Sequence, residues 1–171
     1  MGAGDGGWSG RGAGAGAAVA LGAESRTELE ALYRVQRAPM VRLARLMTGS
    51  RATAEEVVQD AFLRVAARVV DVDNPEAYLR TTVVNLARTH LRRLGLERQL
   101  PPQNQPATSQ PEVDEMWAAV CRLPFSQRAV LALRFYEDLA EDDIARTLGC
   151  RVGTVKSRLH RGLANLRKDV R

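Results

Sequence analysis

The stretch of sequence that decides the fold is IARTLGCRVGTVKSRLHRGLANLR, residues 144–167. Ile144 and Leu148 fall on one face of a first short helix, and Gly149 stands where a left-handed turn would end that helix. Beyond the turn, apolar side chains recur at helical spacing and make one inward stripe: Val155, Leu159, Leu163 and Leu166. The pattern predicts a helix-turn-helix.

The outward side of the second helix is basic. Residues 151–171 hold seven Lys and Arg side chains and one Asp, a net charge of +6, so the other 150 residues sum to −1 within a total of +5. A cationic segment on a near-neutral body favours an anionic partner, with nucleic acid first among the candidates. In a helix-turn-helix such a helix enters the major groove of DNA. A helical hairpin with a solvated basic face would give the same charge pattern.

The two helices of the predicted helix-turn-helix both lack a favoured N-cap. Ala140 and Arg151 stand near the N-cap positions of the two helices, where Ser, Thr, Asp or Asn would stabilise the first turn by about 1 kcal/mol. We hypothesise that Arg151 is kept there for a contact with a phosphate or a base.

The rest of the chain also follows helical patterns. Residues 1–24 form an arm rich in Gly and Ala, for which the composition predicts disorder. Ser25 to Glu28 and Thr53 to Glu56 each match a capping box and predict helix starts, the second helix running to about Val70. Pro39 predicts the start of a separate helix, because proline fits a first turn. Asn74 and Pro75 supply a cap and a first-turn proline for a helix that ends at about Arg93.

Residues 94–111 hold four prolines and four glutamines and predict a flexible linker. Helical patterns resume at about 112–122, 126–136, 141–148 and 153–168, and no run alternates as a strand does. The fold class is therefore all-α: two small helical domains, 25–93 and 112–171, joined by that linker.

Composition excludes several classes of protein. No run of eighteen apolar residues and no secretion signal occurs, so we expect a cytoplasmic chain that does not insert into a membrane. Cys121 and Cys150 lack metal-ligand spacing and are expected to be reduced. His90 and His160 lie on basic helices without a converging acid or nucleophile, so we expect no enzyme, no cofactor and no small-molecule substrate.

Three segments carry a family resemblance. LPFSQRAVLALRFYEDL (123–139), followed by residues 144–167, closely resembles region 4 of the extracytoplasmic-function (ECF) sigma factors, with GTVKSR at 153–158 as its most specific part. AEEVVQDAFLRV (54–65) resembles region 2.2, and residues 74–93 resemble regions 2.3 and 2.4. The resemblance covers about residues 26–93 and 112–169. The sequence YEDL at 136–139 is similar to that of actinobacterial members.

The resemblance implies a role for each segment. Region 4 of the family reads the −35 promoter element as duplex, and the matching candidates are Arg151, Thr154, Lys156, Ser157, Arg158 and Arg161. Regions 2.3 and 2.4 bind the −10 element and help to open it, and the candidates there are Asn74, Arg80, Thr81, Asn85, Arg88, Arg92 and Arg93. Region 2.2 docks on the β′ clamp coiled coil of core RNA polymerase, which implicates Val58, Gln59, Asp60 and Phe62.

Some assignments stay open at this point. Val58 and Phe62 fit plain core packing as well as a polymerase contact. The loop at 71–74 falls where the family holds an unstacked base, and Tyr78 stands where many members have Trp, yet a core aromatic would look the same. The resemblance also implies promoter DNA as a partner and allows an anti-sigma factor as another.

Two other functions compete with the sigma factor. A stand-alone helix-turn-helix regulator would bind DNA without polymerase, usually as a dimer. A helical adaptor would bind polymerase and read no sequence. The second helical domain, with its region 2.2 resemblance, argues against the first. The second stays open, and loss of polymerase binding in Asp60→Arg with DNA contacts intact would favour the sigma factor over it.

Overall fold

The computed structural model describes residues 22–68, 71–100 and 111–169 of the 171-residue chain. These residues form seven α-helices and no strand, which confirms the all-α prediction. The helices are α1 (Ala23–Thr48), α2 (Arg51–Ala66), α3 (Pro75–Arg93), α4 (Pro111–Arg122), α5 (Phe125–Phe135), α6 (Glu141–Leu148) and α7 (Val152–Asp169).

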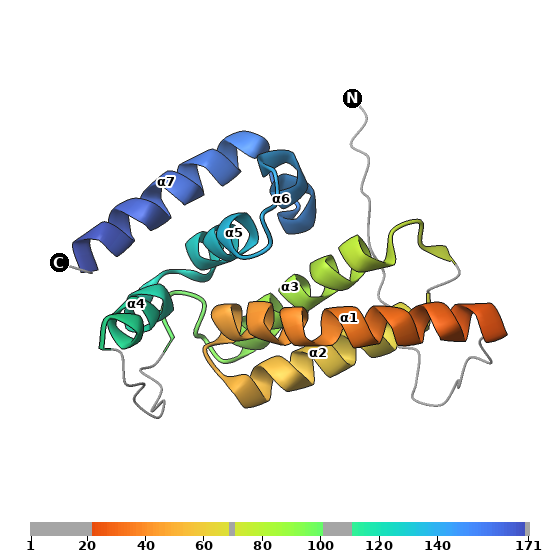
Figure 1. The fold of residues 1–171 in the computed structure, drawn as a ribbon. Helices are drawn as coiled ribbons and strands as arrows, with labels where there is room; N and C mark the ends of the chain where they lie inside the picture. Colours follow the sequence, from red (N-terminus) through yellow and green to blue (C-terminus); the bar gives the residue numbers. More distant parts are fainter. Residues whose placement is uncertain (1–21, 69–70, 101–110, 170–171) are drawn as a thin grey trace.

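The helices form two groups that pack against each other. Helices α1, α2 and α3 make one bundle, and α5, α6 and α7 lie across it, with α4 at one end (Figure 1). Contacts between α1 and α5 and between α3 and α6 join the groups. One cluster of buried side chains runs through both, from Met40 and Leu79 to Val130 and Ile144. None of the helices in the described ranges has an apolar stretch of the length needed to traverse a bilayer.

The helix break predicted at Pro39 is wrong. Helix α1 continues through Pro39, although proline has no N–H to donate to the carbonyl of Val35. Val35 is 65% exposed, so water can reach this end of the missing bond. The following turns are fixed by the core, because Met40 and Leu43 are fully buried. Tertiary packing therefore outweighs the local penalty.

Both predicted capping boxes are also wrong in position. Helix α1 begins at Ala23, with Gly22 as its N-cap, and the hydroxyl of Thr27 donates to the carbonyl of Ala23. Helix α2 begins at Arg51, because Ser50 is the N-cap and its hydroxyl accepts from the N–H of Thr53. Helix α2 ends at Ala66, before the predicted end.

The predicted start and end of α3 are confirmed. The side-chain carbonyl of Asn74 accepts from the N–H of Ala77 at 2.9 Å, and Pro75 occupies the first helical position. The helix ends at Arg93.

The described part of the predicted linker packs against both helix groups. Leu100 is 3% exposed and donates its N–H to the carbonyl of Cys121, while the carbonyl of Glu97 accepts from the N–H of Phe125. Leu100 also lies against Gly49, whose positive φ of 75° closes α1. Residues 101–110, the proline-rich part of that prediction, lie outside the described residues, as do residues 1–21 of the predicted arm. The disorder predicted for the end of that arm is wrong, because Ala23 and Glu24 belong to the first turn of α1.

A buried arginine joins the two groups. Arg128 on α5 is 1% exposed and donates to the carbonyl of Met47 from Nε and Nη2, at 3.1 and 2.8 Å. Its Nη1 donates to the carbonyls of Leu123 and Cys121, at 2.8 and 3.2 Å. Met47 and Cys121 lie in the last turns of α1 and α4, where carbonyls have no partner within the helix. Burial lowers the pKa of Arg128 to about 10, so it stays charged at neutral pH.

Replacing Arg128 with Lys should lower the free energy of unfolding by about 2–3 kcal/mol, because an ammonium group cannot serve three carbonyls arranged around a planar fork. Chemical denaturation measures the change. The control is Arg122→Lys, an exposed residue paired with Asp169, which should change the stability by less than about 0.5 kcal/mol. Equal effects of the two substitutions would contradict the role given to Arg128.

Helix α7 carries two glycines in different surroundings. A Cβ added to Gly162 would lie 2.9 Å from Cδ1 and 3.3 Å from Cγ of the buried Leu131 on α5, whereas one added to Gly153 meets nothing within 4 Å. Gly162 therefore allows α5 and α7 to cross closely.

Gly153→Ala should stabilise the chain by about 0.5–1 kcal/mol, the ordinary gain in helix propensity. The Gly162→Ala variant should be less stable than the Gly153→Ala variant by about 1–3 kcal/mol in unfolding free energy, because the added methyl group overpacks Leu131. Thermal unfolding of the two variants, one the control for the other, gives the difference. A Gly162→Ala variant as stable as Gly153→Ala would show that the crossing has room to spare.

Candidate nucleic-acid and polymerase interface

The predicted helix-turn-helix is present as α6 and α7. Gly149 has φ 63° and ends α6 in the left-handed conformation, and the N–H of Cys150 donates to the carbonyl of Ala145. Ile144 and Val155 are fully buried where the two helices meet. The other members of the predicted inward stripe, Leu159, Leu163 and Leu166, are half-buried.

The N-cap positions are as predicted. Ala140 precedes α6 and makes no side-chain cap, and three acids in the first turn, Glu141 among them, stabilise its positive end. The carbonyl of Arg151 accepts from the N–H groups of Thr154 and Val155. The side chain of Arg151 is exposed, as a contact with DNA would require.

The predicted −35 residues lie at the start of α7 and along its first three turns. Arg151, Lys156 and Arg161 are exposed, and Thr154, Ser157 and Arg158 are half-buried. Nζ of Lys156 lies 3.7 Å from the carboxylate of Glu141, an exposed pair that costs little to break. The basic face is therefore available to a ligand.

The predicted −10 residues lie along α3 in two settings. Asn74, Asn85, Arg92 and Arg93 are exposed, and Thr81 is half-buried. Arg80 and Arg88 instead face the second helix group. Nε of Arg80 donates to the carboxylate of Glu137 at 2.8 Å, with the two side chains only 12% and 9% exposed. The guanidinium of Arg88 lies over the ring of Phe125 at 5.6 Å.

Glu137 is a residue that the sequence pattern missed. It follows α5 in a tight turn, next to Asp138 at a positive φ of 51°, and its N–H donates to the carbonyl of Ala132. Glu137 and Arg80 are 57 residues apart. Only the packing of α3 against the second group could reveal this pair.

A groove between α1 and α2 contains the predicted polymerase-binding segment. Val58 and Phe62 line it but are 2% and 7% exposed, so most of each side chain packs in the core. Gln59 and Asp60 are exposed. Tyr33 stacks edge-on against Phe62, with ring centroids 4.9 Å apart.

The exposed apolar residue of this groove is another that sequence reasoning missed. Leu63, beside Phe62, is 65% exposed and lines the groove with Tyr33. The apolar pattern held a signal for it, because Leu63 lies off the buried stripe of α2, where an apolar side chain is expected to face solvent.

The predicted base-holding loop borders a second hollow. Val72 to Glu76 line it together with Leu32 and Val35 of α1. Tyr78 does not line this hollow. It is half-buried and packs against the core, which favours a core aromatic over a residue that stacks on a base.

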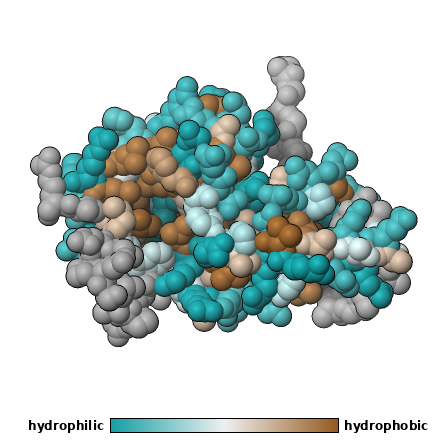
Figure 2. Space-filling view, in the orientation of Figure 1, coloured by the Kyte–Doolittle hydropathy of each residue, from teal (hydrophilic) through white to brown (hydrophobic). Residues whose placement is uncertain are grey.

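A third feature is apolar and lies over the second helix group. Figure 2 shows a hydrophobic patch on the side of α4, α5 and α7. Its groove is lined by Leu131 and Phe135 of α5, Leu163 and Leu166 of α7, and Val120 of α4. Phe135 is 65% exposed.

Comparison with known proteins identifies both helix groups. Residues 32–97 match the model of sigma-70 region 2, and residues 114–166 match the model of sigma-70 region 4. The chain belongs to the ECF subfamily of the sigma-70 family. Region 2 thus comprises α1–α3, and region 4 comprises α4–α7.

The family assignment also rests on curated relatives. An RNA polymerase sigma-E factor of Streptomyces avermitilis is 31% identical over 153 residues, 84% of this chain and 85% of the relative. The ECF RNA polymerase sigma factor SigL of Mycobacterium tuberculosis is 34% identical over 153 residues, 81% of this chain and 86% of the relative. Both sources are actinobacteria, in agreement with the predicted subtype.

A solved structure shares the fold. The sigma factor RpoE in complex with the anti-sigma factor NepR from Bartonella quintana matches with a TM-score of 0.67 and 22% identity, covering 84% of this chain and 96% of that one.

Removing Glu137 should weaken the contact between regions 2 and 4. Glu137→Ala leaves the guanidinium of Arg80 buried without its closer partner, at a cost of about 2–3 kcal/mol in unfolding free energy. Glu76→Ala removes the other partner of the same guanidinium, a pair at 3.1 Å whose acid is 49% exposed, and should cost less than about 0.5 kcal/mol. Urea denaturation compares the two, and a larger effect of Glu76→Ala would contradict this ranking.

Proposed function

We propose that this chain is an alternative sigma factor, which binds core RNA polymerase and directs transcription initiation at promoters with defined −10 and −35 elements. The observation that carries the proposal is that one chain has both a basic face on α7 and a polar, partly cationic face on α3. Two DNA-facing helices on separate regions suit a promoter with two elements, because joining two modest readers raises their combined affinity.

Within this function, α7 reads the −35 element as duplex. Thr154 and Arg151, near the N-terminus of α7, are placed to reach base edges, whereas Arg161 lies further along the helix and suits a phosphate. The helix-turn-helix geometry of α6 and α7 supports this division.

Helix α3 contacts the −10 element. Asn85, Arg92 and Arg93 present donors and positive charge to a strand backbone. Arg80 can join them only after it leaves Glu137. All of the −10 candidates can therefore contact DNA together only after regions 2 and 4 separate.

The polymerase contact is assigned to α2. Gln59 and Asp60 offer exposed polar groups, and Leu63 offers an apolar one beside the groove. A mixed acidic and apolar face suits a basic, partly apolar helix of the polymerase clamp. This assignment puts the chain in the cytoplasm, where the polymerase is.

An anti-sigma factor is a further partner under this proposal. The related RpoE fold was solved with one bound. The apolar patch on α4, α5 and α7, with Phe135 exposed, is a surface that such a protein could cover.

In vitro transcription with core polymerase and a randomised promoter library tests the function. We expect initiation at one class of promoter, and Asp60→Arg should reduce it at least about tenfold by reversing the charge at the polymerase contact. Glu24→Arg, an exposed acid at the start of α1, is the matched control and should leave initiation unchanged. Sequence-specific DNA binding without any polymerase-dependent initiation would favour the stand-alone regulator instead.

A further inference from the structure

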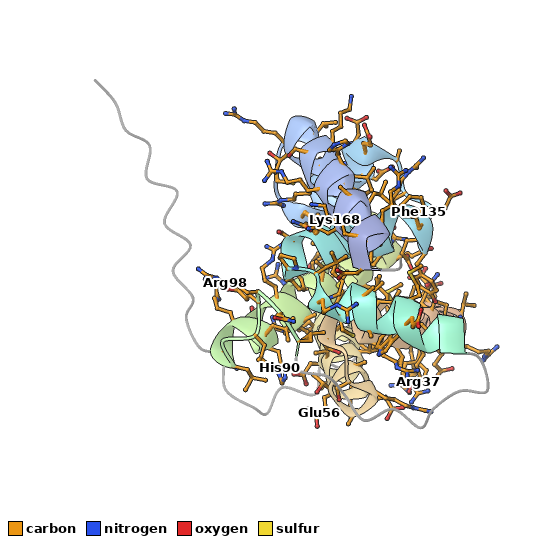
Figure 3. The ribbon with its side chains drawn as sticks, turned by 90° about the vertical axis from the view of Figure 1, so that its left-hand side faces the viewer. Arg37, Glu56, His90, Arg98, Phe135 and Lys168 are labelled. Atoms are coloured by element: carbon orange, nitrogen blue, oxygen red, sulfur yellow. The ribbon has the colours of Figure 1, made fainter. Side chains whose placement is uncertain are left out.

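A cationic pocket lies where regions 2 and 4 meet. Five segments line it: α3, the residues after α3, the start of α5, the end of α6, and α7. Its lining includes Arg88, Arg98 and Arg158, together with Glu97, Phe125 and Cys150. The pocket has a volume of about 490 Å³, within the range of small-molecule sites. Figure 3 shows Arg98 on the side of the molecule that carries His90, away from Phe135.

The charge of the pocket is unbalanced. Three of the lining residues are arginines and one, Glu97, is an acid, so the lining carries a net charge of +2. Among the residues that the structure describes, Arg88, Arg98 and Arg158 form no ion pair. Burial and then the nearby charge of Arg158 lower the pKa of Arg88. Holding two half-buried guanidinium groups together is unfavourable without a counter-charge.

The contacts of these arginines leave donors for a ligand. The face of Arg88 rests on the ring of Phe125, and Nη1 of Arg158 lies 3.8 Å from Sγ of Cys150, a weak contact. A guanidinium group in such a setting can still donate two parallel hydrogen bonds to a phosphate. Helix α5 adds its positive end, because its first turn has no acid and its N-cap is Pro124, which makes no side-chain cap.

The geometry points to a binding site for a small molecule with two or more phosphate groups, held between Arg88, Arg98 and Arg158. The ligand chemistry is that of a phosphate ester or anhydride, for which arginine forks are well suited. One phosphate group would balance the net charge of +2 on the lining, and a second phosphate group would bind the third arginine.

Promoter DNA is a poor occupant of this pocket. Under the proposed function, Arg158 belongs to the −35 reader and Arg88 to the −10 reader. Those elements lie about 25 base pairs apart, roughly 80 Å of duplex at the usual rise. Both arginines can share one phosphate group only while regions 2 and 4 stay together. A compact anion fits this arrangement, whereas a promoter would separate the two arginines.

The site therefore couples a ligand to promoter binding. A molecule that binds only when the two regions are packed together stabilises that arrangement in proportion to its concentration above its dissociation constant. It also occupies two arginines of the promoter readers. This consequence rests on the proposed function, whereas the pocket itself does not.

Titration calorimetry of the full chain with inorganic pyrophosphate tests the site at constant ionic strength. We expect saturable one-to-one binding to the wild-type chain. Arg98→Ala should raise the dissociation constant at least about tenfold, the loss expected for one charge-assisted contact. Arg64→Ala, an exposed arginine on α2 outside the pocket, is the matched control and should leave it unchanged. No saturable binding, or equal losses in the two variants, would overturn the site.

Arg98 is exposed and outside the promoter readers, so its variant should fold and should bind DNA normally. A labelled −35 duplex measures this directly by fluorescence anisotropy. Pyrophosphate should displace the duplex from the wild-type chain more than potassium chloride of equal ionic strength does, and Arg98→Ala should abolish the excess. If Arg98→Ala weakens duplex binding as much as pyrophosphate binding, these arginines serve the DNA backbone and the small-molecule site is overturned.

The two proposals fail separately. Pyrophosphate binding that depends on Arg98, in a chain that does not initiate transcription, would retain the site and defeat the sigma function. Promoter-specific initiation by a chain that does not bind pyrophosphate would retain the function and defeat the site.

Discussion

The packing of regions 2 and 4 depends on one buried guanidinium group. Arg128 reaches from α5 to the carbonyls of Met47 in the last turn of α1, Cys121 in the last turn of α4 and Leu123 just after α4, and all three accept its hydrogen bonds. The negative ends of two helix dipoles face this positive charge. Without it, the apolar residues around Met47 and Leu123 would cover unsatisfied polar groups, which is unfavourable in a protein interior.

This packing changes which of the residues proposed to read the promoter are accessible. Residues of α7 such as Lys156 remain open to solvent, whereas Arg80 of α3 is held by Glu137 and Arg88 lies on Phe125. Under the proposed function, most of the residues proposed to read duplex DNA are thus accessible, whereas part of the surface proposed to open it is covered. If Arg80 and Arg88 bind the −10 element as proposed, DNA binding and contact between the regions use the same arginines, so each opposes the other.

The candidate site was predictable where function depends on short-range pattern. The turn at Gly149, the inward Val155 and the basic face of α7 all follow from residues within one or two helical turns, and the structure agrees. The same reasoning failed at Pro39, where a local rule for proline gave a break that the buried Met40 and Leu43 prevent. It could not decide between core packing and a surface contact for Val58 or Phe62, because an apolar stripe does not show how much of each side chain a neighbour covers.

The sequence by itself determined the all-α class, the helix-turn-helix and the family, because helical periodicity, turn glycines and motif spacing are properties of neighbouring residues. Only the tertiary structure decided how the two regions meet. The pairing of Arg80 with Glu137, and the approach of Arg158 to Arg88 and Arg98 around one pocket, join segments that are more than fifty residues apart. Charge attraction and burial act through space, so no spacing along the chain records them.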